Sequence, residues 1–325
     1  MHETTPWPGV KEWHRPLLLV AAATAPFVVI SLAGIVLDDR VLVGAPIWFK
    51  PFKFAVSIVI YAVTWSWLVA YLPRHRLVRW SAAVIAASLA IEYVIIVGQV
   101  VRGRQSHFNV ATPLDAVLWA TMATSIALLW LANLVVAVFL MRRQIGGRPL
   151  TWAVRAGTVI SLFGMGVAFM MTRPTAAQRD SLRDGGFAGI IGGHSVGVVD
   201  GGPIMPVTGW NTAGGDLRVT HFIGIHALQV LPLLAILLSL LAGRVPLLGA
   251  ETVRTRLVLV ASAGYAGLTG LTLWQALRGQ PLIRPDELTL VVAGVLLGLV
   301  VAGAVTVIGA GWAASPGRPG RQPRL

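Results

Sequence analysis

One carboxylate stands inside an apolar stretch of this chain that is long enough to cross a membrane. Glu92 lies in LAIEYVIIVGQVVRGRQSHFN, residues 89–109. An unpaired carboxylate is costly in hydrocarbon, so Glu92 needs a partner, a proton or a chemical role. On an ideal helix it shares one face with Gln99 and Arg102. We therefore expect its carboxyl group to face the interior of a helix bundle, within one hydrogen bond or one water molecule of His226, Gln99 or another polar residue.

A second polar face is predicted in the segment DLRVTHFIGIHALQVLP. Arg218, His226 and Gln229 recur there at helical spacing, whereas His221 points about 140° away. The two histidines are five positions apart, which does not suit the i, i+4 spacing of a helical metal pair, so we expect them to contact different partners. Glu92 and His226 are the residues that we expect to act in catalysis or proton exchange.

Two further histidines lie in loop motifs that are rich in small residues. His107 belongs to RGRQSHFN and His194 to GGHSVGVVDGG, where glycine allows the backbone to approach a ligand closely. Ordinary turn chemistry also explains each motif taken alone. Together with the two helical histidines, the motifs predict a metal or haem site whose ligands come from His107, His194, His221 and His226.

Cations and amides near the same level predict a substrate site. Lys53, in GAPIWFKPFKF, has two interpretations: it snorkels to the outer headgroups, or it turns inward toward Glu92 or an anionic substrate. The chain has no credible nucleotide-binding loop, HExxH motif or nucleophile elbow that would name a reaction. The residues expected to bind a substrate are Lys53, Gln99, Arg102, Asp115, Arg218 and Gln229.

The composition indicates the environment of the protein. Hydrophobic residues make up 56% of the 325 residues and charged residues only 12%, which indicates a polytopic membrane protein. The chain has no cysteine and therefore no disulfide, thiolate metal site or cysteine nucleophile. Its net charge of +13 comes from arginines in short loops, where they act as topology signals, so we expect no nucleic-acid partner. The excess of arginine over lysine fits a GC-rich bacterial genome, and we expect a bacterial cytoplasmic membrane.

Eight apolar segments are long enough to span a hydrocarbon core of about 30 Å as helices. They predict an all-α fold with one multi-pass transmembrane bundle domain over residues 16–312. A cytoplasmic segment, 1–15, precedes the bundle, and a basic, disordered tail, 313–325, follows it. The predicted helices cover residues 16–37, 48–72, 80–101, 114–140, 151–171, 217–241, 257–278 and 288–312.

The distribution of basic residues predicts that both termini are cytoplasmic. This orientation places the arginine-rich loops PRHRLVR and MRRQIGGR inside the cell, as the positive-inside rule requires. It also separates the histidines, because His2, His14 and His75 fall inside and the other four fall in or near the outer half.

The longest loop, residues 172–219 between the fifth and sixth predicted helices, is then extracytoplasmic. It is rich in Gly, Val and Ile, which suits packing better than solvation, so we expect it to be ordered and to cover the mouth of the bundle.

Three functions agree with these patterns. The first is a metal- or haem-dependent membrane redox enzyme that acts on a lipid-like or quinone-like substrate. The second is a proton-coupled transporter or solute-binding protein that uses Glu92 and His226. The third is a membrane scaffold or assembly factor whose outer loop docks another protein. The lipid bilayer is the partner common to all three.

Overall fold

The computed structural model describes residues 7–187 and 189–314. The chain is 71% helical and contains eight helices long and apolar enough to cross a membrane, so the predicted helical bundle is confirmed. Most of the expected basic tail, residues 315–325, and the first six residues lie outside the described part. The eight helices are α1 (Arg15–Leu37), α2 (Phe49–Ala70), α3 (Arg76–Val101), α4 (Pro113–Met141), α5 (Arg148–Met171), α7 (Leu217–Leu241), α8 (Glu251–Leu277) and α9 (Glu287–Ala314).

Short elements occupy the connections between these helices. A helix of eight residues and four two-residue strands lie at the end of the bundle that carries the longer loops. They are α6 (Ala176–Arg183), β1 (Val41–Leu42), β2 (Ala45–Pro46), β3 (Ser195–Val196) and β4 (Gly215–Asp216). Two 3-10 turns, η1 (Val10–Glu12) and η2 (Pro246–Gly249), complete the described elements. Strand β1 pairs with β2, and β3 pairs with β4, both antiparallel.

Local sequence signals explain where the helices begin. Proline occupies the first turn of α1, α4 and α5, where a missing backbone N–H costs no hydrogen bond. The Thr112 hydroxyl accepts a hydrogen bond from the Asp115 backbone at the start of α4. The Asp216 carboxylate accepts one from the Arg218 backbone at the start of α7. Both caps lie at the loop-bearing end, and they fix the entry of two helices that line the site described below.

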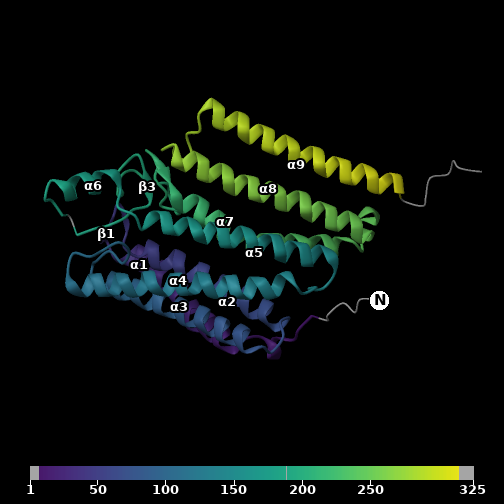
Figure 1. Ribbon diagram of the computed structural model, residues 1–325, viewed down its shortest axis with the longest axis horizontal. Coiled ribbons are helices and arrows are strands. Elements are labelled where there is room, and N and C mark those ends of the chain that lie inside the picture. Colours follow the sequence, from purple (N-terminus) through teal and green to yellow (C-terminus); the bar gives the residue numbers. More distant parts are fainter. Residues whose placement is uncertain (1–6, 188, 315–325) are drawn as a thin grey trace, which may run out of the picture.

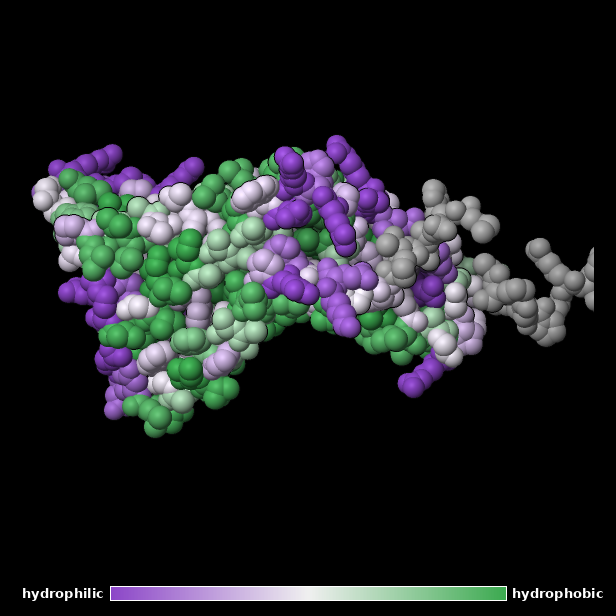
Figure 2. Space-filling model, turned by 90° about the horizontal axis from the view of Figure 1, so that it is seen from below, coloured by the Kyte–Doolittle hydropathy of each residue, from purple (hydrophilic) through white to green (hydrophobic). Residues whose placement is uncertain are grey.

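The helices form two groups that lie against each other (Figure 1). In the first group α1 packs on α2, and α3 packs on α4. In the second group α5, α7 and α8 pack on one another, and α9 covers α8 from outside. Helix α9 is apolar and largely exposed, as expected of a helix that faces lipid. Apolar side chains cover a broad band between the polar ends of the molecule (Figure 2).

Glycines bring α5 and α7 into direct backbone contact. A Cβ atom on Gly164 would lie 2.6 Å from the Gly224 Cα atom, and one on Gly224 would lie 2.5 Å from the Gly164 Cα atom. The contact continues about two turns earlier on α5 and one turn later on α7, where a Cβ atom on Gly157 would lie 2.7 Å from the Ala227 carbonyl oxygen. Small residues at a helix crossing allow this approach, which replaces the missing hydrophobic driving force in lipid with close packing.

The loop-bearing end is tied together by backbone hydrogen bonds. The Val110 N–H donates to the Gly189 carbonyl, and the Ile191 N–H donates to the Phe108 carbonyl, both at 2.8 Å. The Leu217 N–H donates to the His194 carbonyl at 3.0 Å. Residues of the long connection between α5 and α7 are therefore joined to the connection between α3 and α4 and to the start of α7. Elements α6, β1 and β3 gather at this end in Figure 1.

The glycine contact predicts a sharp difference between two substitutions. Gly164→Ala should lower the stability of the protein by about 1–3 kcal/mol, because the new methyl group overpacks the α5–α7 crossing. Gly270→Ala is the matched control, since nothing lies within 4 Å of its Cβ position on α8. Unfolding of both variants in mixed micelles measures the difference. Equal stability of the two variants would contradict the packing described for α5 and α7.

The expected orientation can be tested with single cysteines, because the natural chain has none. Val199, which is 76% exposed, lies at the loop-bearing end, and the exposed Arg244 follows α7 at the other end. A membrane-impermeant maleimide should label Val199→Cys in intact cells. It should label Arg244→Cys only after permeabilisation. The reverse pattern would place both termini outside the cell.

Candidate functional site

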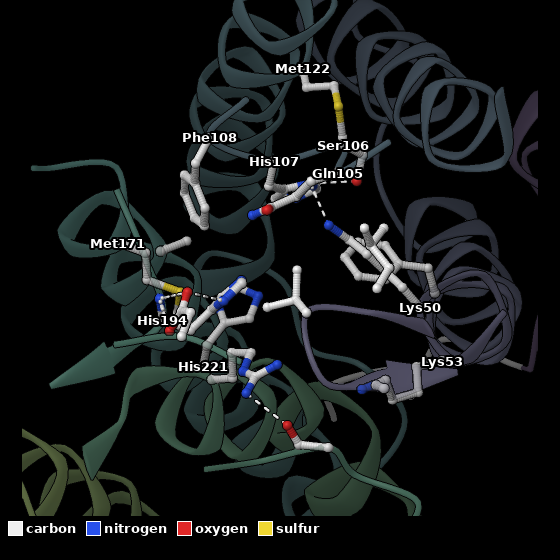
Figure 3. A pocket seen from close by; sticks show the side chains of 18 of the residues that line it. Lys50, Lys53, Gln105, Ser106, His107, Phe108, Met122, Met171, His194 and His221 are labelled. Carbon is white, nitrogen blue, oxygen red and sulfur yellow. Dashed lines mark hydrogen bonds and ion pairs between the residues drawn. The ribbon is translucent and has the colours of Figure 1, made fainter. Parts of the chain in front are cut away.

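A cavity of about 620 Å³ lies at the loop-bearing end, between the two helix groups (Figure 3). Its volume lies within the range of about 300–1,000 Å³ that is usual for small-molecule sites. Helices α2, α3, α4, α5 and α7 contribute to its wall, as do the loops that contain His107 and His194. The apolar part of the wall combines aliphatic residues and methionines with aromatic rings, among them Phe54, Phe108, Trp119 and Phe222.

A chain of three polar side chains crosses one wall of the cavity. The Lys50 ammonium lies 2.9 Å from Nδ1 of His107, and Nε2 of His107 lies 3.2 Å from Oε1 of Glu92. The Ser106 hydroxyl also lies 3.2 Å from the same Nδ1 atom. Because an ammonium group can only donate, Nδ1 accepts and Nε2 carries the proton that is donated to Glu92. Glu92 is 3% exposed, and its second oxygen, Oε2, is buried without a hydrogen-bond partner among the described residues.

The loop between α3 and α4 folds back into the bundle, and its conformation brings His107 to Glu92. Phe108 has a φ of 64°, in the left-handed region that non-glycine residues rarely adopt. Asn109 holds the turn, because its amide donates to the Gln105 carbonyl at 3.0 Å and its carbonyl accepts from the Ala111 N–H at 3.1 Å. As a result, His107 points toward Glu92. The Phe108 ring packs edge-on against His194, with centroids 5.1 Å apart.

Burial lowers the pKa of His107, and the neighbouring Lys50 lowers it further, against the opposing effect of Glu92. His107 is therefore neutral at pH 7, in agreement with the tautomer that its hydrogen bonds require. The partner of Glu92 is thus His107, a polar residue of the loop, and neither His226 nor Gln99 forms this hydrogen bond in the described structure.

His194 is held by a carboxylate on the opposite wall. Its Nδ1 atom lies 3.0 Å from Oδ2 of Asp200, which also accepts hydrogen bonds from the backbone N–H groups of His194 and Ser195. Burial lowers the pKa of His194 to about 4, and the nearby Arg218 contributes, while Asp200 opposes the change. Burial disfavours ionised Asp200, but the hydrogen bonds from His194 and Ser195 hold its pKa well below the usual range. The neutral imidazole donates Nδ1–H to Asp200, which leaves the lone pair of Nε2 for a ligand.

The two histidines of α7 face different surroundings, as the five-residue spacing predicted. The Nδ1 atom of His221 lies 2.9 Å from the Gly164 carbonyl oxygen on α5, and the side chain lines the main cavity. The Nδ1 atom of His226 lies 3.2 Å from Oε1 of Gln229. His226 lines a second, smaller cavity of about 160 Å³, which shares Glu92, His107 and His221 with the main one.

Two half-buried cations, Lys53 on α2 and Arg218 on α7, have different partners. Arg218 binds Asp216 with two guanidinium nitrogens and donates to the Gly209 carbonyl at 2.8 Å. Lys53 donates to the Thr208 carbonyl at 2.7 Å. Within the described residues no carboxylate oxygen lies within 4.0 Å of the Lys53 or Lys50 nitrogen. Lys53 therefore points inward, as the second interpretation of its position expected, and its charge lacks a paired carboxylate.

Four of the residues expected to bind substrate lie elsewhere. Gln99, Arg102 and Asp115 form a cluster between α3 and α4, in which the Asp115 carboxylate accepts hydrogen bonds from Gln99 and Arg102 at 2.9 Å. Gln229 contacts Thr64 on α2. None of these four side chains lines the main cavity, whereas Lys53 and Arg218 do. Their hydrogen bonds join α3 to α4 and α7 to α2, which suits a structural role in the bundle.

The four histidines expected to bind a metal are not brought together as one set of ligands. No group of three or more His, Asp or Glu side chains in residues 7–187 and 189–314 is placed to hold a metal ion. His107 uses both ring nitrogens in other contacts, and His226 faces the smaller cavity. His194 and His221 also line the main cavity with a fixed Nδ1 atom, and unlike His107 neither has a hydrogen bond or ion pair at Nε2 among the described residues.

The predicted site did not include Lys50, Arg104, Ser106 and Asp200, which line the cavity. Two of them had a sequence signal. Lys50 lies three residues before Lys53 and so on the same side of a helix, and Asp200 follows His194 within one glycine-rich motif. Arg104 and Ser106 had no comparable signal, because the inward fold of their loop is not readable from spacing.

The fold and the cavity define a multi-pass helical membrane protein with a buried polar site at one end of the bundle. Comparisons with protein-family models, with curated proteins and with solved structures give no match to this chain. The site geometry therefore carries the functional argument.

The lowered pKa of His194 predicts a stability change with pH. The unfolded histidine takes up a proton near pH 6.5, whereas the folded one resists protonation down to about pH 4. Above pH 6.5 His194 is neutral in both the folded and the unfolded state and does not change the free energy of unfolding. As the pH falls toward 4, only the unfolded state gains the proton, so at pH 5 the free energy of unfolding should be lower by about 2 kcal/mol. His194→Gln should therefore lose less unfolding free energy than the natural protein between pH 7 and pH 5. An equal loss in both proteins, measured in mixed micelles, would contradict the environment assigned to His194.

Proposed function

We propose that this protein binds an acidic amphiphile in its main cavity and exchanges a proton with the head group of that ligand. The observation that carries the proposal is the hydrogen-bonded chain of Lys50, His107 and the buried Glu92, which lines the main cavity together with Lys53, whose ammonium has no carboxylate partner among the described residues. Lipid-like and quinone-like molecules, the substrate class expected from the sequence, share the required apolar body and polar head.

The charges of the cavity favour an anionic or strongly accepting head group. Lys50, Lys53, Arg104 and Arg218 line it, against the two lining carboxylates of Glu92 and Asp200, and the Asp216 carboxylate forms its ion pair with Arg218. Buried cations are retained where a charged partner compensates their desolvation. A ligand carboxylate, phosphate or phenolate beside Lys53 supplies this compensation.

The free oxygen of Glu92 supports proton exchange. Oε1 accepts the His107 hydrogen bond, whereas Oε2 has no partner in the described structure, and Glu92 borders both cavities. The titratable groups around it are Lys50 from α2, His107 from the loop, and His221 and His226 from α7 across the smaller cavity. Uptake of a proton at Oε2 turns this acceptor into a donor for a ligand or a water molecule.

A second candidate function, proton-coupled transport, is favoured by the smaller cavity. It extends from Glu92, His107 and His221 to His226, so groups able to carry protons continue beyond the main site. Enzyme and transporter share the binding step, and the same ligand experiment therefore tests the common part of both.

The binding step can be tested with a dansyl-labelled undecanoate and its neutral methyl ester, added to the full chain in nanodiscs of zwitterionic lipid. The carboxylate should bind more tightly than the ester. Lys53→Gln should weaken carboxylate binding roughly tenfold, or about 1.4 kcal/mol, and leave the ester unaffected. Arg256→Gln, an exposed position on α8, is the matched control and should bind like the natural protein.

Glu92→Gln completes the test of proton exchange. It retains size and hydrogen bonding but removes the titratable proton, so carboxylate binding should no longer be accompanied by net proton transfer, as measured from the dependence of the binding enthalpy on the ionisation enthalpy of the buffer. The proposal fails if carboxylate and ester bind equally to the natural protein. Unchanged proton transfer on binding in Glu92→Gln would remove Glu92 from the mechanism.

A further inference from the structure

We propose that the main cavity binds haem and that Nε2 of His221 and Nε2 of His194 bind its iron. This inference rests on the proposed function, because haem is itself an acidic amphiphile with an apolar macrocycle and two propionate groups. It goes further by naming the ligand class and the two atoms that bind it.

The first support is the way in which both imidazoles are held. His221 donates Nδ1–H to the Gly164 carbonyl, and His194 donates Nδ1–H to the Asp200 carboxylate, at 2.9 and 3.0 Å. Histidines that bind metals almost always donate their other ring N–H to a carbonyl or carboxylate, which fixes the tautomer and the ring orientation. In both residues the remaining nitrogen, Nε2, carries no proton and has a lone pair for a ligand, and both side chains line the cavity.

Aromatic neighbours restrict the two rings further. The Phe108 ring meets His194 at an interplanar angle of 66°, and the Phe222 ring meets His221 at 73°. Gly164, whose carbonyl holds His221, is fixed by its backbone contact with Gly224. The imidazoles are therefore positioned by packing as well as by hydrogen bonds, as preorganised ligands require.

The second support is the number of protein ligands. A bare metal ion needs three or more donors, and the described residues contain no such group of His, Asp or Glu. A porphyrin supplies four nitrogen donors itself, so one or two histidines complete the coordination of its iron. Two separately oriented histidines are thus sufficient for haem and insufficient for an isolated ion.

The remaining lining suits the other parts of haem. Phe54, Trp119 and Met122 provide apolar contacts for a flat macrocycle. Lys53, which has no carboxylate partner among the described residues, and Arg104, which also lines the cavity, provide charges for the propionates.

Titration of the full chain with haemin tests the assignment by absorption spectroscopy. One equivalent should give the spectrum of a low-spin, six-coordinate haem. His221→Ala and His194→Ala should each lose that spectrum and bind haemin at least tenfold more weakly. His75→Asn is the matched control and should keep the natural spectrum, because the exposed His75 precedes α3 at the opposite end of the bundle and lines neither cavity.

Metal-free protoporphyrin IX separates iron ligation from binding of an acidic amphiphile. It should bind to the natural protein and to both cavity variants alike, which also shows that the variants are folded. If the two variants keep the natural haemin spectrum, or if haemin binds no more tightly than protoporphyrin IX, the haem assignment is overturned and the proposed function stands. If neither protoporphyrin IX nor the dansyl carboxylate binds to the natural protein, the proposed function itself is overturned.

Discussion

The hydrogen bond between His107 and Glu92 is the interaction on which the loop-bearing end depends. A buried carboxylate in a membrane helix must be compensated, and in this protein a loop supplies the partner. The loop turns inward at Phe108, whose backbone then pairs with Ile191 and so anchors the long connection before α7. His194, on that connection, accepts a hydrogen bond from the first residue of α7. The hydrogen bond that compensates the buried Glu92 therefore also helps to fix the conformation of both loops at this end of the bundle.

The balance of charge around the cavity follows from the same constraint. Arg218 and Asp216 neutralise each other, and Asp216 also accepts from the Asn211 backbone, so this pair completes the start of α7. Lys50 is matched to His107 and Glu92 through the hydrogen-bonded chain. Among the described residues, the Lys53 ammonium has a hydrogen bond to the Thr208 carbonyl and no ion pair with a carboxylate. The charge of Glu92 is therefore compensated within the protein, whereas that of Lys53 is not. A negatively charged ligand group would contribute most binding free energy beside Lys53.

Close packing of α5 and α7 prepares the other wall. Gly164 and Gly224 allow the two backbones to touch, and this approach places the Gly164 carbonyl within reach of His221. The same crossing thus holds two helices together in lipid and sets the orientation of a cavity histidine. A larger residue at either glycine should therefore change both the packing of α5 on α7 and the orientation of His221.

The sequence by itself determined the eight spans, since hydrocarbon thickness sets the length of an apolar helix and little else is needed to find it. It also determined that Glu92 faces inward and that His221 and His226 have different partners, because helical periodicity fixes the face of each residue. Periodicity does not fix which element lies opposite that face. Gln99 and Arg102 share the face of Glu92 but bind Asp115, since α4 begins at their level. Only the tertiary structure decided that a loop histidine reaches Glu92, because the inward turn at Phe108 depends on long-range contacts with residues more than eighty positions away in the sequence.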